Sequence, residues 1–462
     1  MPAWRTGHRP VFLAHACDVA AVIDRRYSRK MIVRARIVVT MNGAPIQNGA
    51  VHVLNGRIVD VGDFSNVARA NDGIIDLGES VLLPGLINAH CHLDYTCLRG
   101  KIPRQKSFTN WIRVINAEKG KLTPEDYVAS INAGFAEAQR FGTTTIANLT
   151  AFPELIPKIN PPIRSWWFAE LIDVRSRCSN VAENSTALSR RVSDTDEIVD
   201  LTVEKLAVQN HWGLAPHAPF TASATLYRRC EEVARRENVL LTTHLAESRE
   251  EMEMFRDASG PLYQFLKEIG REMADCGYDT PLRRFLRELL FPQLGPSIRA
   301  GQAVPLGMTG QWIIAHLNEL SEGDFDLLRE IRHKFSIAHC PRSHAYFSHF
   351  AFQFERLQRL GFNVCLGTDS LASNDDLSLF AEMRAFQKQF PKVPSERILE
   401  MVTINPAHAL RQENELGRIE RGFLADMIAL PFTRSENVYQ TILNFVGKVP
   451  WFMLHGKTVA TP

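Results

Sequence analysis

The feature that most constrains the fold is an alternation of short apolar runs with helical stretches, which begins at Pro84 and continues to about residue 411. This alternation is typical of a parallel sheet built from βα units. We predict strands at residues 83–92, 143–149, 165–173, 212–216, 239–244, 312–316, 335–339 and 363–367. Eight such units predict an α/β fold of the (β/α)₈ TIM-barrel type.

Both ends of the chain outside this region have the pattern of β structure. From Met31 to residue 83, β-rich runs alternate with turn signals, and Asn55-Gly56 between two of these runs indicates a hairpin. β-rich runs return after residue 411. We therefore predict one small β-sandwich made from residues 31–83 and 412–462, with the barrel at residues 84–411 inserted between its two parts.

Two segments fall outside this plan. The apolar runs of residues 1–30 are interrupted by His15 and Asp18, whereas a signal peptide needs an uninterrupted apolar centre. We expect an N-terminal extension outside the fold, and a secreted form with these residues as its signal is the alternative.

Residues 248–311 form a long connection between the fifth and sixth strands. Such a connection is commonly functional or an oligomer contact, and a decoration without a chemical role is an equal alternative.

The composition excludes several classes of partner. The 462-residue chain has 45% hydrophobic and 23% charged residues, as ordinary globular proteins do. Its net charge of +2, without a basic run, indicates no nucleic-acid partner. The apolar runs are too short to span a bilayer, so we expect no membrane partner. The eight cysteines are scattered without a Cys-x-x-Cys pair, which favours a cytoplasmic location.

The strongest functional signal is His90-Cys91-His92 at the end of the first predicted strand. Residues i and i+2 of a strand project to the same face, so both imidazoles point the same way. They lie at the carboxyl end of the strand, where TIM-barrel enzymes carry their active sites. Two imidazoles at this spacing can share one metal ion, although His-x-His alone leaves a purely structural role equally open.

A second signal is His244, which closes the fifth predicted strand and is followed three residues later by Glu247. A third imidazole at another strand end would complete a set of three histidine ligands. A carboxylate on the same rim can take a proton from water and give it to a leaving nitrogen. Considered by itself, Glu247 is better explained as a solvated residue at the start of a helix.

Two further polar residues follow the same rule, because Asp369 comes after the eighth predicted strand and His316 closes the sixth. A buried aspartate is costly unless it is paired or bound to a cation, so Asp369 is a candidate metal ligand or water-orienting base. A helix N-cap is the alternative, for which Asp375 and Asp376 are better placed. His316 could orient water and assist proton transfer, or be a core histidine. Polar groups at the same end of four predicted strands together indicate a catalytic site.

These motifs identify a family. The chain resembles the amidohydrolase superfamily, in particular its mononuclear deaminase branch, from about residue 31 to the C-terminus. The resemblance rests on five motifs that occur in order: Pro84-Gly85-Leu86-Ile87-Asn88-Ala89-His90-Cys91-His92, Pro216-His217-Ala218-Pro219-Phe220, His244-Leu245-Ala246-Glu247-Ser248, His339-Cys340-Pro341-Arg342-Ser343 and Gly367-Thr368-Asp369-Ser370. The third and fourth are similar to deaminases of methylthioadenosine, adenosylhomocysteine and aminodeoxyfutalosine, of which we favour the last.

The resemblance implies a barrel with a companion β-sandwich and one divalent metal ion, zinc in preference to iron. The implied ligands are His90, His92, His244 and Asp369. Glu247 would move protons, and His316 and Asp369 would orient the water. Dinuclear members use a carboxylated lysine on the fourth strand, and residues 212–216 contain no lysine, which favours one metal ion.

The resemblance also implies substrate contacts. His217 matches a position that contacts the substrate in purine-type deaminases, and Trp111 lies where such enzymes place an aromatic wall. Arg342 and His344 are further candidates. His344 stands where asparagine usually follows Ser343, and this departure and the long connection lie where they could reshape the pocket.

The resulting prediction is a metal-dependent amidohydrolase that acts on a non-peptide C–N bond of a small heterocyclic substrate. The favoured reaction is hydrolytic deamination of an adenine-type nucleoside. Amino- or halohydrolysis of another heterocycle, such as guanine, cytosine or a triazine, is the first alternative. A non-catalytic scaffold is the second, but such proteins usually lose ligands and here all are present. Family members are commonly dimers, so the resemblance favours a homodimer.

Overall fold

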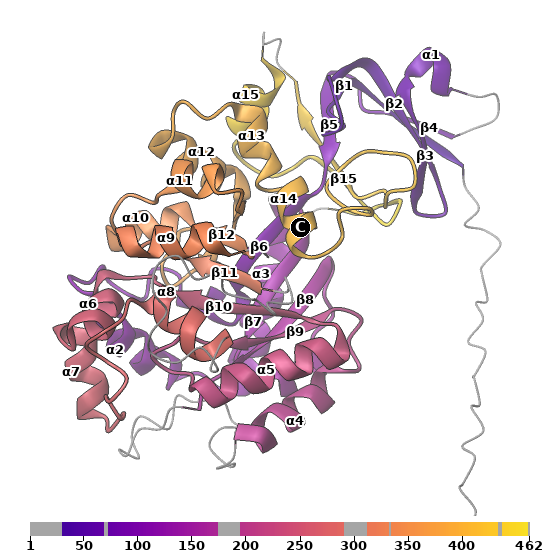
Figure 1. The fold of residues 1–462 in the computed structure, drawn as a ribbon. Helices are drawn as coiled ribbons and strands as arrows, with labels where there is room; N and C mark the ends of the chain where they lie inside the picture. The colour runs from indigo at the N-terminus through magenta and orange to yellow at the C-terminus, as the bar shows by residue number, and fades with distance from the viewer. Residues whose placement is uncertain are drawn as a thin grey trace, which may run out of the picture.

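The computed structural model describes residues 30–68, 73–173, 195–290, 312–331, 334–432 and 437–460. These residues form a large sheet surrounded by helices and a smaller sheet beside it (Figure 1). The predicted extension lies outside the described residues except for Lys30, and so do residues 291–311 of the long connection.

The larger sheet carries the predicted βα pattern. Its strands are β6 (Leu86–His92), β7 (Thr143–Thr150), β8 (Arg164–Leu171), β9 (Trp212–Pro216), β10 (Leu240–Leu245), β11 (Trp312–His316), β12 (Ser336–His339), β13 (Asn363–Leu366) and β14 (Asp369–Ser370). Neighbours pair in parallel from β6 to β13, and β14 pairs with β6. The sheet therefore curls round until its ends meet, as in a TIM barrel.

All eight predicted strands are confirmed, with ends that differ by at most three residues. The largest difference is at the first strand, where residues 80–84 form β5 (Ser80–Pro84) of the other sheet and Gly85 separates β5 from β6. Every residue of β6 and β7 is buried. Burial on both faces explains why neither strand contains Lys, Arg, Asp or Glu.

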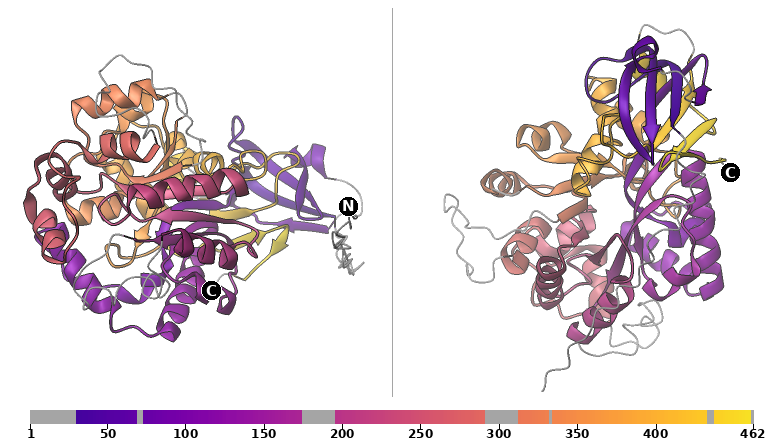
Figure 2. Two further views of the ribbon diagram at one scale, coloured as in Figure 1. Left: turned by 60° about the horizontal axis from the view of Figure 1, so that its bottom comes forward. Right: turned by 90° about the vertical axis from the view of Figure 1, so that its right-hand side faces the viewer.

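Helices cover the outside of the curled sheet (Figure 2). They are α2 (Phe108–Lys119), α3 (Pro124–Arg140), α4 (Thr195–Leu206), α5 (Ala224–Glu237), α6 (Arg249–Asp257), α7 (Gly260–Glu268), α8 (Pro281–Arg284), α9 (Glu322–Glu330), α10 (Pro341–Phe347), α11 (Phe354–Arg359), α12 (Leu379–Gln389), α13 (Ser395–Glu400) and α14 (Ile404–Ala409). Shorter helical turns are η2 (Leu93–Leu98), η3 (Pro153–Lys158) and η5 (Phe285–Leu290). The described part of the long connection is thus largely helical.

The smaller sheet joins the two ends of the chain. It has the order β17-β16-β15-β5-β1-β2-β3, with β4 beside β1. Besides β5, its strands are β1 (Met31–Val38), β2 (Ile46–Leu54), β3 (Arg57–Asp63), β4 (Gly73–Asp76), β15 (Met427–Pro431), β16 (Trp451–Leu454) and β17 (Lys457–Thr458). Helices α1 (Phe64–Val67) and α15 (Val438–Leu443) also lie in these parts of the chain. A second layer, which a sandwich requires, stays a prediction.

The predicted hairpin is confirmed in this sheet. Asn55 and Gly56 connect β2 to β3 with φ angles of 52° and 79°. Two positive φ angles are what a two-residue hairpin turn needs, and Asn-Gly adopts them readily.

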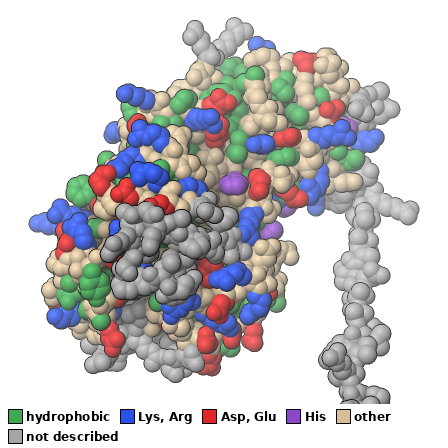
Figure 3. All heavy atoms as spheres, in the orientation of Figure 1, with side chains coloured by type: hydrophobic (Ala, Val, Ile, Leu, Met, Phe, Trp, Pro, Cys, Tyr) green, Lys and Arg blue, Asp and Glu red, His purple; other side chains and the backbone are tan. Residues whose placement is uncertain are grey.

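None of the described helices is both long and apolar enough to cross a bilayer. On the face shown in Figure 3, Lys and Arg side chains are interspersed with Asp and Glu.

Candidate metal centre and active site

The four predicted metal ligands come together at the carboxyl end of the curled sheet. His90 and His92 lie at the end of β6, His244 near the end of β10, and Asp369 at the start of β14. Alternation along β6 puts both of its imidazoles on the same side of the strand. All four side chains are buried.

Asp369 reaches this cluster because the chain turns closely against β6 after β13. At Gly367, a Cβ atom would come within 2.6 Å of the His90 carbonyl oxygen, so only glycine fits there. Thr368 N donates to the same oxygen at 3.0 Å, and Asp369 follows with a positive φ of 56°. Oδ2 of Asp369 accepts from Ser343 Oγ at 2.6 Å. Oδ2 is therefore anchored by Ser343, while Oδ1, which accepts from Ser370 N at 2.8 Å, faces the histidines.

The separations of the ligand atoms are within a few tenths of an ångström of those of groups that share one ion. His92 Nε2 lies 3.1 Å from His244 Nε2. Asp369 Oδ1 lies 3.9 Å from both His90 Nε2 and His92 Nε2. Ligand atoms bound tetrahedrally at about 2.0–2.2 Å from one ion are roughly 3.3–3.6 Å apart. The observed distances lie on either side of this range.

The chemistry of these groups also fits a metal ion. Both ring nitrogens of His90 are buried and have no hydrogen-bond partner among the described residues. Burial lowers the pKa of His90 and of His92 well below the usual value, which favours the neutral form that binds metals. Unpartnered buried nitrogens cost free energy, and a shared cation would remove that cost. Three imidazoles and a carboxylate are typical donors to zinc or iron, so the residues fit one divalent metal ion.

Glu247 and His316 lie beside this cluster. Glu247 Oε1 is 3.7 Å from His316 Nε2, and both side chains are buried. His316 Nε2 has no hydrogen-bond partner in the described part of the chain. Burial, then the charges of Asp369 and Glu251, raise the pKa of Glu247 well above its usual range. Glu247, His316 and Asp369 offer ligand atoms that all lie within 4.8 Å of one another, so the three predicted catalytic groups share one small space.

Glu247 owes its position to the first turn of α6. The carboxylate of Glu251 accepts the backbone N–H groups of Ala246 at 3.2 Å and Glu247 at 2.8 Å. Asn318 Nδ2 donates to the Glu247 carbonyl oxygen at 3.0 Å. Ser248 caps α6 through its side chain. The alternative of a solvated helix-start residue therefore does not describe Glu247, which lies in the buried turn before the helix.

Of two predicted substrate contacts, His217 lies beside the predicted ligand His244, whereas Trp111 packs against Phe347. The ring of His217 is 5.0 Å from that of His244, and the His217 carbonyl oxygen is 2.9 Å from His244 Nδ1. Trp111 meets Phe347 edge to face at 5.0 Å and donates through Nε1 to the Ala372 carbonyl oxygen at 3.5 Å. Contact of these two side chains with a substrate stays a prediction.

Arg342 and His344, the other two predicted contacts, have protein partners. Arg342 Nη1 lies 2.5 Å from Asp376 Oδ1, and Nη2 lies 3.0 Å from Asp375 Oδ2. His344 Nε2 lies 2.7 Å from a backbone carbonyl oxygen. A substrate role for either stays a prediction. The helix that follows, α12, is capped by Ser378, so none of the three aspartates considered for that role, Asp369, Asp375 and Asp376, is its N-cap.

The sequence prediction missed Glu170, which is the penultimate residue of β8. Glu170 Oε1 lies 3.9 Å from His217 Nε2. With His92 and His244 it forms a group whose potential ligand atoms all lie within 4.8 Å of one another. A polar residue at a strand end is the signal that identified His316, and it applies equally to Glu170.

Comparisons with known proteins agree with this geometry. The profile of the amidohydrolase family matches residues 81–459. The chain is 28% identical over 417 residues to the 5-methylthioadenosine/S-adenosylhomocysteine deaminase of Pyrococcus furiosus, with 87% of each protein covered. It is 29% identical over 442 residues to the enzyme of that name from Syntrophobacter fumaroxidans, with 90% of this chain and 89% of the relative covered.

Two solved structures share the fold. One is an adenosine deaminase from Xanthomonas campestris with bound zinc, with a TM-score of 0.74, 23% identity and coverage of 93% of this chain and 92% of that one. The other is the aminofutalosine deaminase of Helicobacter pylori in complex with methylthio-coformycin, with a TM-score of 0.76, 21% identity and coverage of 93% and 100%. Because the family profile matches most of its length and the ligand residues converge as described, the chain belongs to the amidohydrolase family.

Proposed function

We propose that the chain is a metal-dependent deaminase that hydrolyses the exocyclic C–N bond of an adenine-type nucleoside and releases ammonia. The observation that carries this proposal is the buried carboxyl of Glu247, 3.7 Å from His316 Nε2 and next to the metal-ligand cluster. A carboxyl so placed can move protons between water, a ring nitrogen and a leaving amine. The similarity to methylthioadenosine/adenosylhomocysteine deaminases over most of the chain supports an adenine nucleoside as the substrate.

In this proposal, one zinc or iron ion is held by His90, His92, His244 and Asp369. A divalent ion bound there would supply water acidified toward a pKa of about 7. Similarity to a zinc-containing structure supports zinc.

The side chains of the protein perform the remaining tasks. Glu247 takes one proton from the attacking water and delivers it to the ring nitrogen. It then takes the second proton, from the hydroxyl now bonded to the ring carbon, and delivers it to the departing amine, so that ammonia leaves and a ring carbonyl remains. His316 Nε2, which has no partner among the described residues, holds the water by a hydrogen bond. Asp369 stays fixed by Ser343, and its other oxygen, Oδ1, orients the same water. His217, whose ring lies 5.0 Å from that of His244, contacts the base.

The experiment that tests the proposal is an ammonia-release assay on the purified protein, with metal analysis of the same sample. The substrates are adenosine, 5′-methylthioadenosine, S-adenosylhomocysteine, aminodeoxyfutalosine, guanine and cytosine. We expect ammonia from at least one adenine nucleoside and about one equivalent of metal. Release from guanine or cytosine alone would replace the substrate class, and release from none would contradict the proposal.

A further inference from the structure

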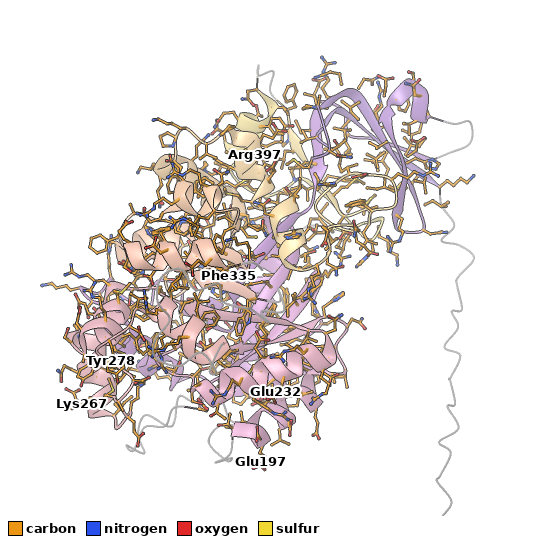
Figure 4. The ribbon with its side chains drawn as sticks, viewed as in Figure 1. Glu197, Glu232, Lys267, Tyr278, Phe335 and Arg397 are labelled. Atoms are coloured by element: carbon orange, nitrogen blue, oxygen red, sulfur yellow. The ribbon has the colours of Figure 1, made fainter. Side chains whose placement is uncertain are left out.

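The long connection after β10 carries a buried cation, Arg271, that the proposed reaction does not use. Arg271 follows the end of α7, where its backbone N–H donates to the Leu266 carbonyl oxygen at 2.9 Å. Its side chain is only 3% exposed. Lys267, on the same stretch of chain, is exposed at the outer edge of the molecule (Figure 4). Because a buried charge is costly unless it is paired, the partners of Arg271 show what it holds.

The Arg271 guanidinium has five N–H groups, and the structure provides an acceptor for each. Nη1 and Nη2 each donate to Asp275 at 2.7 Å, and Nη1 also donates to the Glu272 carbonyl oxygen at 2.7 Å. The other two bonds leave the connection. Nε donates to the Phe220 carbonyl oxygen at 2.9 Å, and Nη2 donates to that of Pro219 at 3.5 Å. The side chain therefore joins the connection to the segment that follows β9.

Pro219 and Phe220 are the central residues of a β-turn after β9. Thr221 N donates to the Ala218 carbonyl oxygen at 2.9 Å and closes the turn, in which proline stands at its favoured second position. The closing bond of such a turn does not use the carbonyl oxygens of its two central residues, although both residues are buried here. Arg271 supplies donors to both oxygens, so it satisfies the buried backbone of the turn.

The same turn orients the ring of His217, the proposed contact of the base. Thr221 Oγ1 lies 2.6 Å from His217 Nδ1, and the Phe220 ring meets that of His217 edge to face at 5.7 Å. The backbone of His217 is held separately, because its N–H donates to Leu171 at 3.0 Å and its carbonyl oxygen accepts from His244 N at 2.9 Å. A shift of the turn would therefore move the His217 ring and leave the backbone beside His244 in place.

Other helices of the connection hold Arg271 in position. Arg284 of α8, whose side chain is 5% exposed, also pairs with Asp275, at 2.7 Å. Both guanidinium groups lie over the ring of Phe255 from α6, at 5.8 Å and 5.1 Å from its centre. Phe255 and Phe220 belong to one apolar cluster. The turn is thus held by a buried network built from α6, α8 and the end of α7.

We propose that Arg271 is a positioning residue: by holding the turn of residues 218–221, it fixes the ring of His217 against the base of the substrate. This inference rests on the proposed function, which takes His217 as the contact of the base. It also gives the long connection a functional role, one of the two alternatives expected from the sequence. A contact that binds the base equally in the ground state and in the transition state affects KM and leaves kcat unchanged.

The test compares Arg271→Met and Arg271→Lys with the wild type, on the adenine nucleoside that the wild type deaminates best. We expect Arg271→Met to raise KM by about 10-fold, with kcat within about 2-fold and bound metal at the wild-type level. Lysine keeps the charge beside Asp275 but lacks the planar fork, so Arg271→Lys should recover only part of the loss. The matched control is Lys267→Met, an exposed cation of the same connection, which should leave KM unchanged.

Two further measurements separate positioning from a general loss of structure. In the background of His217→Ala, Arg271→Met should raise KM no further, because the ring that Arg271 positions is absent. Amide hydrogen exchange of residues 218–222, which needs no substrate, should be faster in Arg271→Met than in the wild type and unchanged in Lys267→Met.

Several results would overturn the assignment. An unchanged KM in Arg271→Met would do so, and so would an equal rise of KM in the presence and absence of the His217 ring. Unchanged exchange of the turn would show that Arg271 does not hold it. Loss of metal in both Arg271 variants would assign the connection to support of the metal ligands instead. Absence of ammonia from every adenine nucleoside would contradict the proposed function itself, and hydrogen exchange would still report whether Arg271 holds the turn.

Discussion

Single hydrogen bonds decide which atoms of the histidines face the metal position. His244 Nδ1 lies 2.9 Å from the His217 carbonyl oxygen, which can only accept, so Nδ1 carries the proton and Nε2 is the free ligand atom. Such a second hydrogen bond commonly fixes the orientation of a metal-bound histidine. His90 has no such partner among the described residues and depends on burial for its position. His244 is therefore the most firmly oriented of the three imidazoles.

Replacement of Glu247 by glutamine tests the proton-transfer role. Glutamine keeps the shape of the side chain but cannot transfer a proton at this position, so we expect kcat to fall on the order of 10²-fold or more. The metal content should stay at the wild-type level because Glu247 is not one of the four ligands. Steady-state kinetics and metal analysis of Glu247→Gln and of the exposed control Glu232→Gln would check this. Full activity of Glu247→Gln would remove Glu247 from the mechanism.

Among the connections, the turn between β10 and α6 shows how a local motif places a catalytic group. Ala246 has a positive φ of 50°, which is unfavourable for a residue with a side chain. The Glu251 carboxylate stabilises this turn by accepting the N–H groups of both Ala246 and Glu247. The buried carboxylate thus fixes the backbone from which Glu247 extends, and Glu251 is a positioning residue.

We expect Glu251→Ala to lower kcat by about 10-fold or more and to change KM little, because a displaced proton donor affects the transition state most. Glu251→Gln should recover part of the loss, since its amide oxygen can still accept one of the two N–H groups. Kinetics of both variants with metal analysis provide the measurement. A higher KM with an unchanged kcat would contradict positioning of Glu247 through these hydrogen bonds. Equal activities of the alanine and glutamine variants would also contradict it.

The strands were predictable because parallel strands buried on both faces are short runs with few charged residues. Of the eight, only β8 contains any Lys, Arg, Asp or Glu, namely Arg164 and Glu170. The strand ends were less predictable, and this is why Glu170 was missed. The sequence placed the end of that strand at residue 173, whereas β8 ends at Leu171, so Glu170 was taken as an interior residue.

For the molecule as a whole, the proposed metal ligands connect strands from three separate parts of the chain, β6, β10 and β14. An ion that binds only the folded state stabilises it by about 4 kcal/mol when its concentration is 1,000 times Kd. We therefore expect a chelator to abolish activity and to lower Tm by several degrees, and zinc or iron to restore both. His90→Ala should show a low Tm that a chelator does not change. An unchanged Tm after verified loss of metal would contradict this coupling.

A buried ion pair joins the two sheets, and we expect its loss to lower the free energy of unfolding of the whole molecule. Arg164 opens β8 of the barrel, and its side chain pairs with Asp426, which precedes β15 of the smaller sheet; both side chains are at most 6% exposed. Asp426 also accepts the backbone N–H of His455 at 2.7 Å, and its carbonyl oxygen accepts that of Gly85 at 2.9 Å. Asp426 therefore connects both chain ends to the barrel, at the end of β8 opposite to the active site.

Removal of one partner of a buried ion pair leaves the other charge buried and unpaired. We therefore expect Asp426→Asn to lower the free energy of unfolding by about 3–5 kcal/mol. Asparagine can still accept from His455, so the loss would come from the unpaired Arg164. Adding Arg164→Met removes that charge, and the double variant should be more stable than Asp426→Asn alone. Urea unfolding of the single and double variants measures this coupling, with kcat/KM of the folded fraction as control. Additive losses would mean that each side chain acts alone, and that the sheets are held together by apolar packing instead.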